Sequence, residues 1–218
     1  MAELELVPVK TRILTDKDDI VDMIEKYAKD LIGPDDVISV AESVVAITQG
    51  EFTRPEDLNP GWLARIMCRF VPQKGSLSSV YGMQAAMNYE GEWRMAFAML
   101  VGMAAKCIGK SGVFYQMAGR QAALIDDVTG TMPPFDKCLV FGPKKPVEVA
   151  EAIRERLGCY GAAVADVNDL KRALIVGVSP GVDPKELSRI LIDNPFGNAS
   201  QRTPVVIIKN YAKVLAGK

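Results

Sequence analysis

The sequence predicts an α+β fold, in which a mixed β-sheet is flanked by helices and a methionine-rich helical segment is inserted in the middle. Apolar runs rich in β-branched residues, typical of strands, lie near residues 37–48, 161–166, 173–178 and 204–209. Helical patterns occupy residues 17–31 and 146–158, and three more helical stretches are expected in the middle of the chain, from Trp62 to about Gly109. Strands and helices do not alternate strictly, which favours α+β over a doubly wound sheet.

The N-terminal part begins with "ELELVPV", whose alternation at its start predicts a strand. The helix expected at 17–31 carries its apolar residues on one face, and Thr15 with Asp18 resembles a capping box at its start. The next run, "VISVAESVVAIT" from Val37, is rich in β-branched residues and predicts one strand or two.

The middle of the chain changes character, because "WLARIMCRF", "SVYGMQAAMN" and "EWRMAFAMLVGMAAKCI" all read as helices. Met95, Met99 and Met103 follow one another at i, i+4 spacing, which is typical of core filler rather than of a cofactor site. The apolar run 95–105 is too short to span a bilayer. A helix that is apolar on most sides must be covered by other elements or by a second subunit.

The C-terminal part predicts a short strand at 138–141, followed by a helix that begins at Pro146 and ends before Gly158. Two strands follow, and then a helix with Asp183 as its N-cap. A turn-rich loop, "NPFGNASQRTP", leads to a final strand, "VVIIKN".

Composition excludes several kinds of chemistry. The 218 residues are 49% hydrophobic and carry a net charge of −1, so bulk charge favours neither a nucleic-acid nor a membrane partner. The chain has no histidine, which excludes Ser-His-Asp and Cys-His catalysis and zinc sites that use histidine. Four widely spaced cysteines indicate reduced thiols, and the acidic N-terminus has no signal-peptide pattern, so we expect a cytoplasmic protein.

Carboxylates stand at two places where apolar runs end. Asp126 follows "ALI", and Asp166 ends "GAAVA" with Asp169 three residues further on. Each is consistent with a solvated turn or with a site for a hard cation such as Mg²⁺ or Mn²⁺. Lys144 and Lys145 precede a helix, where they fit either a solvated pair or a phosphate contact. Neither the G-x-x-x-x-G-K-[ST] loop nor G-x-G-x-x-G is present.

Several stretches together resemble the coenzyme F-420-0:gamma-glutamyl ligase family, whose members attach glutamate to a deazaflavin cofactor precursor with GTP and a divalent metal. "VPVKTRILTDKDDIVDMI" is similar to the family's opening strand and helix start, and "DDVISVAESVVAITQG" is similar to its next conserved segment. "ALIDDV" and "AAVADVND" resemble its two metal-binding stretches, "PFDKCLVFGPKKPVEVAEAIRERL" the segment between them, and "GNASQRTPVVII" its closing nucleotide loop and strand.

The resemblance implies a gamma-glutamyl ligase-like fold and a set of site residues. It implies a metal site at Asp126 and Asp166 for Mg²⁺ or Mn²⁺, and GTP as a co-substrate. The residues expected to contact the nucleotide lie in the opening segment and the closing loop: Pro8, Lys10, Thr11, Asn198, Ser200, Gln201 and Thr203.

The chain also departs from the family pattern. The family's Ser-Lys reads Glu42-Ser43, and its later Ser-Lys-x-Glu reads "AITQ", so two nucleotide-facing lysines are absent. The Ser or Thr after the second metal Asp is Val167. Two hypotheses follow. The first is a nucleotide- and metal-dependent amide ligase acting on an acid and an amino acid, and the second is a non-catalytic or regulatory binding protein on the same fold.

The expected organisation is a ligase-like core of residues 1–60 and 111–218, with 61–110 as a helical segment. A small-molecule substrate and a nucleotide are the expected partners, with neither nucleic acid nor membrane. The apolar helix at 95–105 and the resembled family, which is dimeric, together predict a homodimer.

Overall fold

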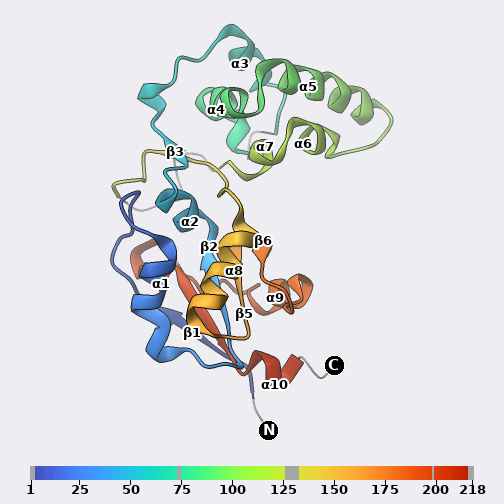
Figure 1. The fold of residues 1–218 in the computed structure, drawn as a ribbon. Coiled ribbons are helices and arrows are strands. Elements are labelled where there is room, and N and C mark those ends of the chain that lie inside the picture. The colour runs from blue at the N-terminus through green and yellow to red at the C-terminus, as the bar shows by residue number, and fades with distance from the viewer. Residues whose placement is uncertain (1–2, 73–74, 126–132, 198, 216–218) are drawn as a thin grey trace. The chain divides into compact units, whose positions relative to one another are not determined.

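The computed structural model describes residues 3–72, 75–125, 133–197 and 199–215 (Figure 1). The chain forms two compact units. Unit 1 comprises Met1–Gly50 and Pro143–Lys218, and unit 2 comprises Glu51–Gly142. Among the described residues, no helix is both long and apolar enough to cross a membrane.

Unit 1 is built on a five-stranded sheet in the order β1-β7-β2-β5-β6. Its strands are β1 (Glu5–Val9), β2 (Val37–Ala41), β5 (Gly161–Asn168), β6 (Arg172–Val178) and β7 (Val205–Lys209). The pairing of β2 with β5 is parallel, with Ala41 opposite Ala165, and the other three pairings are antiparallel. The predicted mixed sheet is therefore confirmed.

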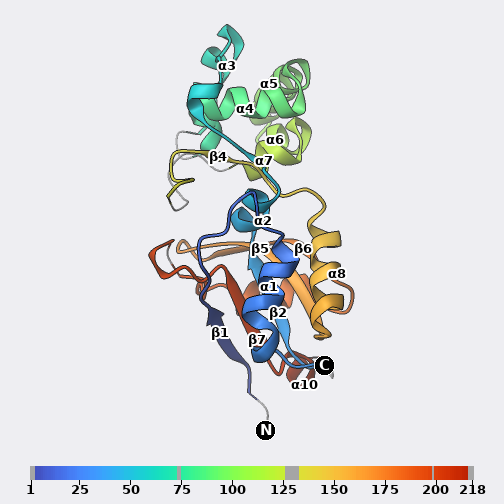
Figure 2. The same cartoon turned by 60° about the vertical axis from the view of Figure 1, so that its left-hand side comes forward.

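Helices cover both faces of this sheet (Figures 1 and 2). The helices of unit 1 are α1 (Ile20–Ala28), α2 (Glu42–Thr48), α8 (Pro146–Leu157), α9 (Pro184–Ile190) and α10 (Tyr211–Leu215), with 3₁₀ turns η1 (Lys29–Leu31) and η4 (Ala199–Gln201). Ile24 of α1 and Ile153 of α8 pack with Ile38 on one face. Leu187 of α9 and Tyr211 of α10 pack with Val206 on the other. The predicted flanking helices are thus confirmed.

The strand expected at 37–48 is wrong in its second half. β2 ends at Ala41, and residues 42–48 form α2. Val45, Ala46 and Ile47 are buried in this helix, so tertiary packing outweighs the preference of Val45 and Ile47 for strands. A short apolar run does not distinguish a buried strand from a buried helix by periodicity, which is why the sequence misled here.

The start of α1 also differs from the expectation. Asp19 is the N-cap, and its carboxylate accepts hydrogen bonds from the Val21 and Asp22 amides at 2.9 and 3.0 Å. Thr15 and Asp18 instead close the preceding turn, in which the Thr15 amide donates to Asp18 Oδ2 at 2.8 Å. The N-cap is thus Asp19, four residues beyond the expected Thr15, while Asp18 is held by Thr15 and by an ion pair with Arg12.

Asp36, just before β2, ties together the edge of the sheet where β2 begins and β7 ends. Its carboxylate accepts hydrogen bonds from the Gly33 amide at 2.7 Å, from Lys209 Nζ at 2.8 Å and from the Asn210 amide at 2.8 Å. Burial alone would raise the pKa of Asp36, but these three donors outweigh it, so the pKa lies below its ordinary value.

Replacing Asp36 by Asn is therefore expected to destabilise the protein by about 2 kcal/mol at neutral pH, since hydrogen bonds to a charged group are lost. A carboxylate with a lowered folded-state pKa stabilises the fold above its unfolded pKa, near 3.9. This contribution is lost as the pH falls through the lower folded pKa. Urea unfolding of both proteins from pH 7 to pH 3 should show the difference shrinking below about pH 4. A difference independent of pH would contradict the assignment.

Unit 2 consists mainly of helices, with bounds α3 (Trp62–Met67), α4 (Val80–Glu90), α5 (Glu92–Cys107), α6 (Val113–Ala118) and α7 (Arg120–Leu124). A strand pair joins β3 (Phe52–Thr53) to β4 (Leu139–Val140), and two 3₁₀ turns are η2 (Pro55–Asp57) and η3 (Ser76–Ser78). The helices α3 to α5 lie within the helical segment expected at 61–110. The domain limits drawn from the sequence remain a prediction.

Methionines fill the core of unit 2, as predicted. Met83, Met87 and Met95 are at most 1% exposed, and Met99 lies beside them. Met103 is 38% exposed, so the expected methionine row ends before it. A Cβ at Gly102 would lie 2.8 Å from Phe114 Cβ, so this glycine lets α6 approach α5 closely.

Candidate functional site

One edge of the unit 1 sheet gathers most of the residues expected to act on a ligand. β2 and β5 are parallel, β7 is antiparallel to both β1 and β2, and β6 is antiparallel to β5. The strands β1, β2 and β5 therefore end at the edge of the sheet where β6 and β7 begin. We call this the carboxyl edge. At this edge α2 follows β2 directly, and loops or turns follow β1 and β5 and precede β6 and β7. Such edges commonly position ligand-binding groups in α/β sheets.

The opening segment reaches the carboxyl edge at the end of β1. Pro8 is exposed within the strand, and Lys10, directly after it, is also exposed. Thr11 is 7% exposed, and its amide donates to the Arg202 carbonyl at 2.9 Å. This bond joins the opening segment to the loop before β7, so two stretches nearly 200 residues apart in sequence meet at this edge.

The loop that precedes β7, residues 194–203, is a compact turn. Asn194, Gly197 and Arg202 have φ of 51°, 66° and 58°. The Gly197 amide donates to the Asn194 carbonyl at 3.0 Å, and the Thr203 hydroxyl donates to the Phe196 carbonyl. These contacts hold both ends of the loop.

Within that loop the predicted nucleotide residues differ in their surroundings. Ser200 and Gln201 are exposed, whereas Thr203 is half-buried and uses its hydroxyl inside the loop. Asn198, which was also expected to contact the nucleotide, lies outside the described residues.

Asp166 stands at the carboxyl edge, as the first exposed residue after the buried run 161–165 of β5. It follows Ala165, which pairs with the last residue of β2. Neighbouring strand atoms remove part of its water, and this loss of water raises the pKa of Asp166, while the charge of Arg172 opposes the rise. The carboxylate makes no ion pair with any described residue. Its exposed oxygens match the ligand preference of a hard divalent cation.

The second predicted metal ligand, Asp126, lies outside the described residues. By its place in the chain it belongs to unit 2, whereas Asp166 belongs to unit 1. Within the described part of the chain, no three Asp, Glu or Cys side chains are grouped so as to hold a metal ion. The pairing of Asp126 with Asp166 therefore stays a prediction.

Asp169 has a structural role that the sequence did not reveal. Asn194 Nδ2 donates to Asp169 Oδ1 at 2.6 Å, and Lys171 forms an ion pair with Asp193. The turn between β5 and β6 is thus fastened to the start of the loop that carries Ser200 and Gln201. The second carboxylate of "ADVND" supports that loop through Asn194.

Two positions where the sequence departs from the resembled family have clear structural surroundings. Glu42 is 8% exposed and opens α2 directly after β2, so a carboxylate stands at the carboxyl edge where the family motif has a Ser. Gln49 holds the backbone of Lys144, since its Oε1 accepts from the Lys144 amide at 2.7 Å and its Nε2 donates to the Lys144 carbonyl at 3.0 Å. Gln49 and Lys144 are 95 residues apart in the sequence, so no local motif predicts that they are in contact.

The lysine pair before α8 is exposed, and Lys145 forms an ion pair with Glu148 at 2.9 Å. Lys145 is the N-cap residue, with φ of 47°, and Pro146 follows at the first helical position. The backbone of Pro146 lies directly on β6, because a Cβ at Gly177 would be 2.4 Å from the Pro146 carbonyl carbon.

Comparison with models of protein families matches residues 8–167 to F420-0:gamma-glutamyl ligase. This match covers well over half of the chain. The chain belongs to the F420-0:gamma-glutamyl ligase family. The family match runs from Pro8 in β1 to Val167 in β5, so it includes Asp166 and ends before the loop at 194–203. No curated protein matches the sequence significantly. Membership of this family indicates a ligase fold and a link to coenzyme F420 biosynthesis.

Proposed function

We propose that the protein is a nucleotide- and divalent-metal-dependent amide ligase that joins an amino acid to a carboxylate substrate, with glutamate and the F420 precursor as the first pair to test. What supports this is the carboxyl edge, where the opening segment with its exposed Lys10 meets the 194–203 loop, and where Asp166 stands on β5 of the same sheet. An exposed carboxylate and exposed polar side chains at one edge of a sheet suit a nucleotide held through a cation.

The reaction is a phosphoryl transfer followed by an acyl transfer. The terminal phosphoryl group of GTP passes to an oxygen of the substrate carboxylate and leaves GDP. The amine of the amino acid then attacks the acyl phosphate carbon, forms the amide bond and releases phosphate with loss of a proton. Mg²⁺ or Mn²⁺ bound at Asp166, with Asp126 as the second ligand, would offset negative charge on the phosphates.

The residues of this chain have distinct parts in that scheme. Lys10 is a cation that can pair with phosphate oxygens, and Ser200 and Gln201 offer hydroxyl and amide groups from the loop before β7. Thr11 and Thr203 have structural roles. The Thr11 amide donates a hydrogen bond that joins the opening segment to Arg202, and the Thr203 hydroxyl donates to the Phe196 carbonyl within the loop. In a chain without histidine, the attacking amine loses its proton to water, phosphate or a carboxylate.

The alternative function is a binding or regulatory protein that has lost the reaction. The observation that favours it is Glu42, a buried carboxyl group at the end of β2 where the family motif has a Ser followed by a Lys. Both family lysines are absent, since Ser43 and Ile47 stand in their places, so two positive charges that would attract phosphate are lost.

Calorimetric titration with GTP and with ATP, each in the presence of Mn²⁺, tests nucleotide binding. We expect GTP to bind and Lys10→Ala to weaken binding about tenfold, because a charged phosphate contact is lost. Lys17→Ala, which removes another exposed lysine of unit 1, is the matched control and should bind normally. Equal affinities for wild type and Lys10→Ala would contradict the assignment of this edge.

Turnover distinguishes the two functions. Incubation with glutamate, GTP, Mn²⁺ and the F420 precursor, followed by mass spectrometry, should reveal a product heavier by one glutamyl residue. Nucleotide binding without product and without GDP release would support the binding-protein function instead.

A further inference from the structure

The helix α3 and the turn after it carry exposed apolar and basic side chains together. Trp62, Ile66 and Phe70 are 73%, 47% and 61% exposed, and Arg65 and Arg69 are also exposed. The turn continues the path of the helix, because the Arg69 and Phe70 amides donate to the carbonyls three residues earlier, at 3.2 and 3.0 Å. We call these five residues the α3 patch.

The α3 patch is the outer side of an amphipathic segment. Successive residues of a helix are about 100° apart, so the three apolar members of the patch fall within an arc of about 80°. The two arginines extend this arc by about 60° on one side. Ala64 and Met67 lie on the opposite side of the helix, where they are buried in the core of unit 2. The helix is therefore held by its inner side while the α3 patch faces solvent.

The charge along this part of the chain has one sign. Residues 58–89 contain no aspartate or glutamate, and neither Arg65 nor Arg69 forms an ion pair with a described residue. The carboxylates that bound this stretch are Asp57, which is exposed, and Glu90, which is held in an ion pair of its own. The net charge of −1 is an average over the whole chain, so it does not describe this surface. The α3 patch favours an anionic partner.

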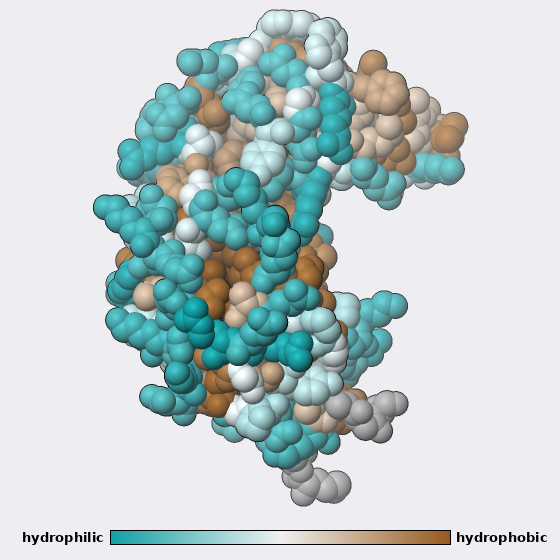
Figure 3. Space-filling model, in the orientation of Figure 1, coloured by the Kyte–Doolittle hydropathy of each residue, from teal (hydrophilic) through white to brown (hydrophobic). Residues whose placement is uncertain are grey.

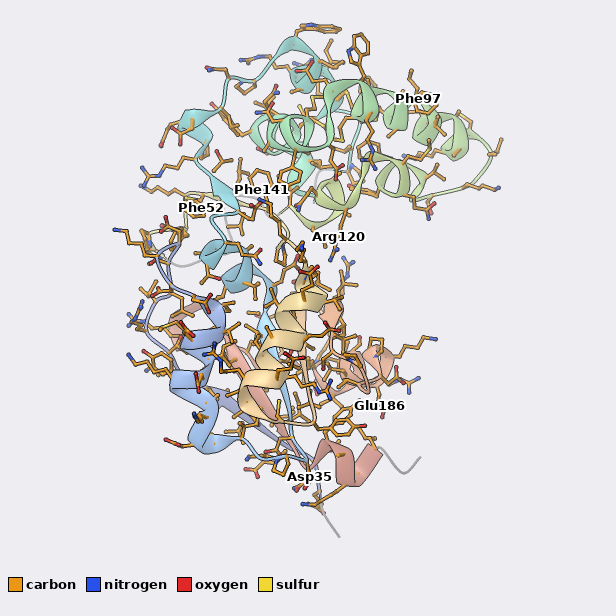
Figure 4. The ribbon with its side chains drawn as sticks, viewed as in Figure 1. Asp35, Phe52, Phe97, Arg120, Phe141 and Glu186 are labelled. Carbon is orange, nitrogen blue, oxygen red and sulfur yellow. The ribbon has the colours of Figure 1, made fainter. Side chains whose placement is uncertain are left out.

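A second exposed apolar surface of unit 2 belongs to a different helix. Trp93, Phe97 and Leu100 of α5 are 87%, 60% and 63% exposed. Figure 4 shows Phe97 on the outer side of α5, and Figure 3 shows apolar residues gathered over this part of unit 2. The subunit contact predicted from the sequence concerns α5, and no member of the α3 patch lies on that helix. The partner of the α3 patch is therefore a separate question.

The composition of the α3 patch fits a membrane surface better than a nucleic acid. Binding to a nucleic-acid backbone depends on many phosphate contacts, and the α3 patch has only two arginines. Ile66, between Trp62 and Phe70, has no ring that could stack on a base. At a lipid surface, by contrast, tryptophan, phenylalanine and isoleucine enter the boundary between headgroups and acyl chains, and arginines remain with the lipid phosphates.

We infer that the protein associates reversibly with membranes rich in anionic lipid through the α3 patch. The three apolar side chains enter the headgroup region, and the two arginines pair with phosphate groups of the lipids. Because only five side chains take part, binding is weak, increases with the fraction of anionic lipid and decreases with salt. This association does not depend on the reaction proposed above.

Flotation of the full chain with lipid vesicles tests the association. We expect the wild type to float with vesicles of phosphatidylglycerol and phosphatidylcholine, and to stay behind with vesicles of phosphatidylcholine alone. High salt should release the bound protein. Absence of binding to the vesicles that contain phosphatidylglycerol, or equal binding to both kinds, would overturn the inference.

Exchange of the arginines tests the charge of the α3 patch. An anionic surface attracts each nearby arginine with an effect of about fivefold on affinity, so Arg65→Gln with Arg69→Gln should weaken vesicle binding by about 25-fold. Lys106→Gln with Lys110→Gln is the matched control, because it removes two exposed positive charges from another part of unit 2. The control should bind like the wild type. An equal loss in both variants would mean unspecific attraction and would contradict a role for α3.

The two tryptophans of the chain test insertion. Trp62→Ser should weaken vesicle binding by about tenfold, whereas Trp93→Ser, which removes the other exposed tryptophan, should not. In Trp93→Phe, the emission of Trp62 should shift to shorter wavelength when vesicles are added. In Trp62→Phe, the emission of Trp93 should stay unchanged. Circular dichroism checks that each variant folds. The opposite pattern would assign the membrane contact to α5 and overturn the inference.

A nucleic-acid partner is the competing explanation of exposed aromatic and basic side chains. Fluorescence anisotropy with a labelled single-stranded oligonucleotide tests it, and we expect no binding under the conditions in which vesicles bind. Binding to the oligonucleotide that is lost in Trp62→Ser, together with no binding to vesicles, would assign the α3 patch to nucleic acid instead.

Discussion

Asp166→Asn is expected to abolish both the ligase reaction and the rise in melting temperature that Mn²⁺ produces. The substitution keeps the size of the side chain and removes the charge that a divalent cation needs. A ligand at 100 times its dissociation constant stabilises the folded state by about 2.7 kcal/mol. For a chain of this length, that corresponds to roughly 5–10 °C in melting temperature. Thermal unfolding with and without Mn²⁺ measures the effect directly.

The metal-free variant should be as stable as the wild type or slightly more stable. Loss of water raises the pKa of Asp166, so at neutral pH the charged carboxylate is less favourable in the folded state than in water. Asp169→Asn is the matched control, because its amide oxygen can still accept from Asn194 while the metal ligand stays in place. If Mn²⁺ stabilised Asp166→Asn as much as the wild type, Asp166 would not be a metal ligand.

Gly177→Ala should cause a large loss of stability without touching the carboxyl edge. Gly177 lies in β6, and a Cβ there would stand 2.4 Å from the carbonyl carbon of Pro146. Because the obstacle is backbone, α8 must move away from the sheet, and we expect the free energy of unfolding to fall by about 3 kcal/mol. Urea denaturation measures this change.

Gly33→Ala is the control for that experiment, since its Cβ would meet the nearest atom, Asp36 Oδ2, at 3.4 Å, an ordinary contact. The control should change stability by less than about 1 kcal/mol. Equal stability of Gly177→Ala and the wild type would mean that α8 does not rest on β6 as described.

The sequence predicted best those elements whose signals are local. Alternation or apolar runs identified β1, β5, β6 and β7, and Pro146 with Gly158 marked both ends of α8. It failed at residues 42–48, where β-branched residues form a buried helix, because burial and not intrinsic preference decides there. The order of strands had no local signal, since the position of β7 between β1 and β2 depends on contacts across the whole chain.

The candidate site was predicted unevenly for the same reason. Asp166 is visible in the sequence as a carboxylate that ends an apolar run, and the structure places it within β5, opposite Leu174 of β6 and one residue past the end of the pairing with β2. The bond between Thr11 and Arg202, and the support of the loop by Asp169 through Asn194, join segments that no spacing connects. The sequence shows Gln49 only as a departure from the family motif. The structure shows that its side chain makes two hydrogen bonds to the backbone of Lys144.

The place of β7 in the sheet also governs how the protein can be made. β7 is the last strand in the chain, yet it separates β1 from β2, which are among the first segments to leave the ribosome. Until Val205–Lys209 emerges, the facing edges of β1 and β2 have no hydrogen-bonding partner. The sheet is incomplete during this time, and the apolar side chains of β1 and β2 stay exposed. Unit 2 is a compact unit formed by one continuous stretch, Glu51–Gly142, and can fold during that interval. Nascent chains that are cut short before residue 205 are therefore the species that most need a chaperone.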